Sequence, residues 1–93
     1  MNLEDKYPEA YFDHYMAMFN GALSNEALRS HISLAESMEG LEYLEGLLAE
    51  LKMMKQYGDQ EAFMNLAIAH EVRGFEEQHL QFLFDELAAR TSE

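Results

Sequence analysis

The chain has 93 residues, of which 18 are Asp or Glu and 6 are Lys or Arg, so its formal net charge is -12 at pH 7. This length allows one compact domain, residues 1–93, with a single hydrophobic core. The charge argues against direct binding to nucleic acid or to an anionic membrane surface, because both need clustered Lys and Arg. The absence of cysteine excludes disulfides, thiolate metal sites and a cysteine nucleophile.

The composition also favours a folded protein inside the cell. Apolar residues make up 48% of the chain, which is too many for a disordered acidic tail. The first twenty residues carry acidic side chains ahead of their apolar part, which is the wrong polarity for a signal peptide. No uninterrupted apolar run is long enough to cross a bilayer. We therefore expect a cytoplasmic protein.

Three helices are predicted, over about 8–20, 24–57 and 59–90, because no segment alternates with the period of a strand. Pro8 suits the first turn of a helix. Ser24 or Asn25 is a suitable N-cap for the second helix. Gly58 suits the left-handed position that ends a helix, and Asp59 is an N-cap candidate for the third.

Within 24–57, one apolar stripe is followed by a turn that reverses the chain. Gly40 and Gly46 each disfavour helix by about 0.5–1 kcal/mol relative to alanine, so a bend is expected near residues 37–40. The turn at Gly58 should fold the two long helices into an antiparallel hairpin. The stripe that this hairpin buries contains Leu41, Leu44, Leu47, Leu48, Leu51 and Met54.

The segment 59–90, read as one helix, is apolar on two sides, and the second helix can cover only one of them. The short N-terminal helix could cover part of the other side. We expect the remaining apolar surface to lie against a second copy of the chain, so that a homodimer completes a helical bundle. The predicted fold is therefore all-α: a short helix, then a long antiparallel hairpin that dimerises. The predicted self-association residues are Ile68, Val72, Phe75 and Phe82.

The second helix also carries an acidic face, because residues 30–51 contain five glutamates and no Lys or Arg. One interpretation is a solvated surface that keeps the protein soluble. The other is a docking face for a partner with a basic or apolar surface, which the negative charge would steer. Gly40 and Gly46 would let such a partner approach closely. The predicted partner-binding residues are Glu36, Glu39, Tyr43 and Glu50.

A possible metal element lies at Glu76 and His79, whose i, i+3 spacing places both side chains on one helix face. This pair resembles the Glu-x-x-His element of the ferritin-like di-iron proteins, in which helices contribute ligands to iron or another divalent metal. The resemblance implies a metal-binding dimer over about residues 34–87. In the other interpretation Glu76 forms an ion pair with Arg73, and His79 lies at the edge of an apolar face.

No arrangement typical of nucleophilic catalysis is present, since the serines lack a G-x-S-x-G setting and the glycines form no phosphate-binding loop. We therefore expect no catalysis and no cofactor. The leading hypothesis is a small acidic helical module that binds another protein, as an adaptor, regulator or inhibitor. Its target could itself be a basic or nucleic-acid-binding protein. The alternative hypothesis is the ferritin-like metal-binding dimer.

Overall fold

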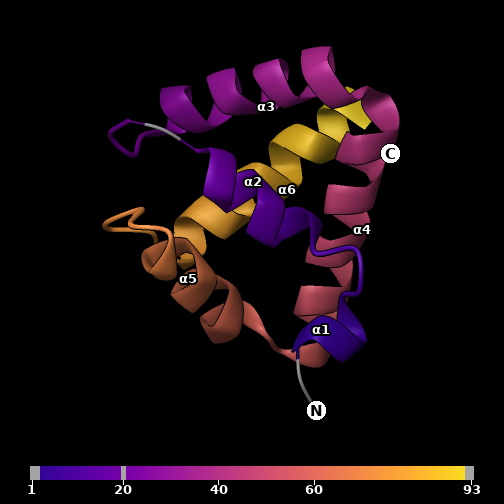
Figure 1. Ribbon diagram of the computed structural model, residues 1–93, viewed down its shortest axis with the longest axis vertical. Helices are drawn as coiled ribbons and strands as arrows, with labels where there is room; N and C mark the ends of the chain where they lie inside the picture. Colours follow the sequence, from indigo (N-terminus) through magenta and orange to yellow (C-terminus); the bar gives the residue numbers. More distant parts are fainter. Residues whose placement is uncertain (1–2, 20, 92–93) are drawn as a thin grey trace.

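The computed structural model describes residues 3–19 and 21–91, and this part of the chain forms only helices and the turns that join them (Figure 1). The prediction of an all-α protein is confirmed. No helix in the described ranges is both long and apolar enough to span a membrane. In chain order the helices are α1 (Leu3–Lys6), α2 (Tyr11–Met18), α3 (Asn25–Glu39), α4 (Leu41–Tyr57), α5 (Gln60–Ala69) and α6 (Glu77–Thr91).

Two predicted helix ends are found where the sequence placed them. The Ser24 hydroxyl accepts a hydrogen bond from the Ala27 N–H at 3.0 Å, which caps the start of α3. Gly58 ends α4 in the left-handed conformation, with φ 73° and ψ 33°. Asp59 begins α5, but its side chain makes no cap hydrogen bond. Its carboxylate instead accepts hydrogen bonds from Tyr7 and Lys6, which fastens the N-terminal segment to this turn.

The two long helices expected over 24–57 and 59–90 are each divided in two. Gly40 has a φ of 90° that favours glycine, and it turns the expected bend into a sharp corner between α3 and α4. Residues 70–76 form a loop between α5 and α6, in which Glu71 and Gly74 have positive φ values of 66° and 79°. The prediction of one continuous helix over 59–90 is therefore wrong.

α4 packs against α6, and α5 lies between these two helices in the chain. Lys55, near the end of α4, donates to Gln81 near the start of α6 at 2.8 Å. At the other end, Arg90 of α6 reaches Glu36 near the end of α3 at 3.4 Å. Figure 1 shows α3 meeting α4 at the corner, and α2 contacts both α4 and α5.

The core lies where these helices meet, and burying each large side chain stabilises the fold by about 1.5–3 kcal/mol relative to leaving it exposed. An aromatic group joins the N-terminal part to α5, because the Phe12 and Phe63 rings stack with centroids 4.7 Å apart. The fully buried side chains include Phe12, Tyr15, Met16, Leu28, Ile32, Leu44, Leu47, Leu51, Phe63, Leu80, Leu83 and Leu87.

Polar contacts also hold α2 in this core. The ring Nε2 of His31 lies 2.9 Å from the Tyr15 carbonyl oxygen and donates to it in the neutral ring. The Tyr15 hydroxyl in turn donates to the Leu28 carbonyl oxygen at 3.0 Å. Burial lowers the pKa of His31, and burial raises the pKa of Tyr15. Both side chains are therefore held in their neutral forms near pH 7.

Candidate functional site

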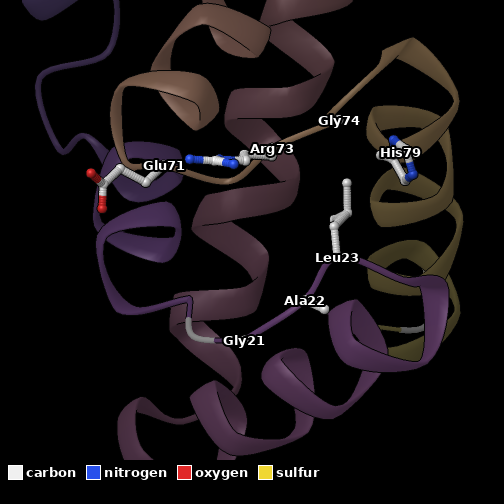
Figure 2. Close-up of a pocket in the computed structure, with 7 residues that line it drawn as sticks. All are labelled: Gly21, Ala22, Leu23, Glu71, Arg73, Gly74 and His79. Carbon is white, nitrogen blue, oxygen red and sulfur yellow. The ribbon is translucent and has the colours of Figure 1, made fainter.

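A groove of about 480 Å³ opens between the loop after α2 and the loop between α5 and α6 (Figure 2). Gly21 and Gly74 line it, with φ values of 100° and 79°. A Cβ atom at either position would meet nothing within 4 Å, so the groove is open to solvent there. The volume is within the range of small-ligand sites.

The polar side chains of this groove do not converge. In Figure 2 Leu23 lies between Arg73 and His79, and the Arg73 guanidinium points away from both. Arg73 makes no ion pair or hydrogen bond within the described ranges. A small-ligand site needs a few polar groups aimed at one point. The groove therefore offers space and one cation, but not a binding constellation.

The structure brings Glu76 and His79 together through a contact between the backbone of one and the ring of the other. Glu76 precedes α6, and its backbone N–H donates to Nδ1 of His79 at 2.9 Å. The Glu76 carboxylate accepts a hydrogen bond from Gln78, and the His79 ring packs on Phe75 with centroids 5.4 Å apart. Among the described residues, no group of three or more His, Asp or Glu could hold a metal ion. The expected Arg73–Glu76 ion pair is also not formed.

The four residues predicted to bind a partner do not share one exposed face. Glu50 is only 5% exposed and Tyr43 only 8% exposed, so neither is available to a partner. Glu36 pairs with Arg90, and Glu39 lies 3.8 Å from the exposed His14. The acidic face is interrupted because α3 and α4 are separate helices that turn different sides towards solvent.

Glu50 has a structural role that the sequence analysis missed. Its two carboxylate oxygens accept hydrogen bonds from the backbone N–H groups of Tyr11 at 2.8 Å and Phe12 at 2.9 Å. These groups belong to the first turn of α2, which has no helical acceptors for them. Burial raises the pKa of Glu50, and the two backbone hydrogen bonds oppose that rise. A carboxylate from α4 thus supplies the N-terminal cap of α2.

The close approach expected at Gly46 is also made within the chain. The Tyr11 ring lies so near Gly46 that any Cβ at this position would overlap it. The same ring packs edge-on against Tyr43, with centroids 5.6 Å apart, and the Tyr43 hydroxyl donates to the Tyr11 carbonyl oxygen. Gly46 therefore makes room for α2 and not for another protein.

The four residues predicted to mediate self-association are separated as well. Val72 and Phe75 are each 4% exposed, because the loop after α5 turns them into the core. Phe82 is partly covered, with the Arg29 guanidinium 5.3 Å from its ring centroid. Ile68 is 56% exposed and does not continue into an apolar stripe with the other three. The reason given for a homodimer, one helix that is apolar on two sides, does not apply to this fold.

A different apolar surface is exposed where α3 meets α4. Leu34 is 52% exposed, Met38 59% and Leu41 43%. Leu34 and Met38 are one turn apart on the outer side of α3, and Leu41 begins α4 directly after Gly40. We call these three residues the corner ridge. Leu41 was expected on the buried stripe of the hairpin, and that expectation is wrong because the stripe begins at Tyr43 and Leu44.

Sequence reasoning could have found the corner ridge. Leu34 and Met38 have the i, i+4 spacing of one helix face. The buried side of α3 follows a second series, which contains Leu28, His31, Ile32 and Ala35. Two apolar series on one helix, of which one is already covered, indicate an exposed face.

No protein-family model, no curated protein and no solved structure matches this chain. The two surfaces that remain for functional interpretation are the groove and the corner ridge.

Proposed function

We propose that this protein is a helical module that binds another protein, and that the corner ridge is its contact surface. The observation that carries the proposal is the exposure of Leu34, Met38 and Leu41. Other apolar residues of α3 and α4, among them Ala35, Tyr43 and Leu44, are packed into the core. Contiguous apolar side chains on the surface of a small domain commonly mark a site of protein contact.

The chemistry of the ridge fits this role. A protein interface has an apolar centre with a polar rim, and methionine is enriched there. Met38 is unbranched and can repack against partners of different shape. The neighbouring positions of α3 and α4 supply a polar rim, with exposed Ser37, Glu42 and Glu45.

The groove supports a chemical function less well than the ridge supports binding. Leu23 lies between the Arg73 and His79 side chains, and the Arg73 guanidinium points away from His79, towards the side of the groove where Glu71 lies. The imidazole and the cation are therefore not aimed at one point, as general acid–base catalysis would need. The ridge, by contrast, offers three exposed apolar side chains with exposed polar residues beside them.

The proposal is tested by capture from a lysate of the source cells. Immobilised wild type is compared with the double variant Leu34→Gln/Met38→Gln, and captured proteins are quantified by mass spectrometry. The matched control is Ser30→Gln/Ser33→Gln, which changes two exposed positions of the same helix outside the ridge and its rim. We expect the ridge variant to lose a captured protein that the control retains. Equal capture by the two double variants, both folded by circular dichroism, would refute the proposal.

A further inference from the structure

We propose that the occupant of the corner ridge is a basic amphipathic helix from another protein. This inference rests on the proposed function and adds the chemistry of the partner. The distribution of charge favours a basic partner. The chain carries 18 acidic and 6 basic residues, and most of the bases are already used within the fold. The internal contacts are Lys6 with Asp59, Arg29 and Arg90 with Glu86, and Lys55 with Gln81.

The two carboxylates beside the ridge, by contrast, have no basic partner within the described residues. Glu42 follows Leu41 directly, and Glu45 lies one turn further along α4 on the same side as Leu41. Both are exposed, and neither forms an ion pair or hydrogen bond in the part of the chain that the structure describes. A partner that carries Lys or Arg beside its apolar residues would meet these two carboxylates when it covers the ridge.

The spacing of the ridge favours a helix as the bound segment. Leu34 and Met38 are separated by about 6 Å along the axis of α3, which is the rise of one helical turn. A second helix with apolar residues at i, i+3 or i+4, and i+7 presents side chains at the same interval. The surface surrounding the ridge is helical, so no strand edge is available there for an extended peptide.

The net charge also favours a basic partner over a second copy of this chain as the occupant of the ridge. Two copies would bring together surfaces from molecules that each carry a net charge of -12. Like charges brought face to face are unfavourable, whereas opposite charges accelerate association and fix orientation. The same charge that opposes self-association therefore favours a basic partner.

The test uses defined peptides and the full chain, with binding measured by fluorescence anisotropy. One peptide of about 18 residues has leucines at i, i+4 and i+7 and lysines at its polar positions, which gives a full helical face. A second peptide has the same composition with the leucines spread around the helix. A third replaces every lysine by glutamate. The second peptide measures attraction by charge alone, and the third removes that attraction.

We expect the amphipathic basic peptide to bind at least about tenfold more tightly than either control peptide. Leu34→Gln/Met38→Gln should remove this preference, and Glu42→Gln/Glu45→Gln should weaken binding severalfold and reduce its dependence on salt. Equal affinity for the first two peptides would overturn the inference. An unchanged affinity of the Leu34→Gln/Met38→Gln variant would overturn it as well.

Two further measurements separate this inference from the proposed function. If sedimentation velocity shows a dimer of the wild type that Leu34→Gln/Met38→Gln dissociates, the occupant is a second copy and the inference is wrong. If ridge-dependent capture from the lysate persists but the basic peptide does not bind, the ridge is a protein contact surface for a partner of another kind. If capture does not depend on the ridge, the proposed function itself fails.

Discussion

The carboxylate of Glu50 accepts a hydrogen bond from the backbone N–H of Phe12 at 2.9 Å, although the two residues are 38 positions apart in the chain. The other oxygen accepts from the N–H of Tyr11. This side chain of α4 thereby fixes the position and direction of α2, which packs against α4 and α5. Residues that look like surface charges in the sequence can thus determine the packing.

The first prediction is that Glu50→Ala destabilises the protein by about 2–4 kcal/mol, because it leaves the N–H groups of Tyr11 and Phe12 without acceptors. Chemical denaturation followed by circular dichroism measures this change. Glu45→Ala is the control, since Glu45 is exposed on the same helix, and it should alter stability by less than about 0.5 kcal/mol. Equal effects of the two substitutions would contradict the capping role.

The second prediction concerns the pH dependence of the same residue. Burial raises the pKa of Glu50 above 4.5, so the folded state takes up a proton more readily than the unfolded state. The stability that this provides is fully present below pH 4.5 and is lost as the pH rises through the raised folded pKa. Glutamine does not titrate. The unfolding free energy of the wild type minus that of Glu50→Gln should therefore increase as the pH falls from about 7.5 to about 4.5. A difference that stays constant would contradict the shift.

The third prediction has the opposite sign and concerns His31. Burial lowers its pKa below 6.5, so the unfolded state takes up a proton more readily than the folded state. The stability contributed by the neutral ring is present above pH 6.5 and is lost as the pH falls towards the lowered folded pKa. His31→Gln, which keeps an N–H donor for the Tyr15 carbonyl, should reduce the loss of stability between about pH 7 and about pH 5. Denaturation at several pH values tests this, and a His31→Gln slope equal to that of the wild type would contradict the prediction.

The fourth prediction is that Gly46→Ala destabilises the wild type although it improves helix propensity. The added methyl group would overlap the Tyr11 ring and displace it from Tyr43. In a Tyr11→Ala background the overlap is absent, and the same substitution should stabilise the protein by about 0.5–1 kcal/mol. The thermal unfolding of the four proteins in this cycle gives the coupling between the two positions. Stabilisation in both backgrounds would show that the ring is not confined by Gly46.

Several local features could be predicted from the sequence because their causes are local. The Ser24 cap and the left-handed Gly58 depend on one or two residues, and both are found as expected. The bend expected near residues 37–40 is present as the corner at Gly40. The class of the fold follows from the lack of alternating patterns and from these helix ends.

The packing of the helices could not be predicted from the sequence in the same way. Val72 and Phe75 continue the apolar spacing of α5 and α6, so the spacing concealed the loop at residues 70–76 that buries them. The positive φ of Glu71 has no sequence signal, because only glycine reveals such a conformation reliably. The partners of Glu50 are backbone N–H groups nearly forty residues away, and backbone groups leave no pattern in a sequence. Glu50, Val72 and Phe75 were therefore predicted on the surface although contacts distant in the chain bury them.

The positive φ of Gly40 sets the shape of the corner ridge independently of the chemistry of its three side chains. Leu34 and Met38 belong to one rigid rod and Leu41 to another, and a single residue sets the angle at which the rods meet. Replacing Gly40 by a residue with a side chain, which this φ disfavours, would reorient Leu41 relative to the other two while leaving all three intact. Substitution at Gly40 would thus change the shape of this exposed apolar surface without changing its chemical composition.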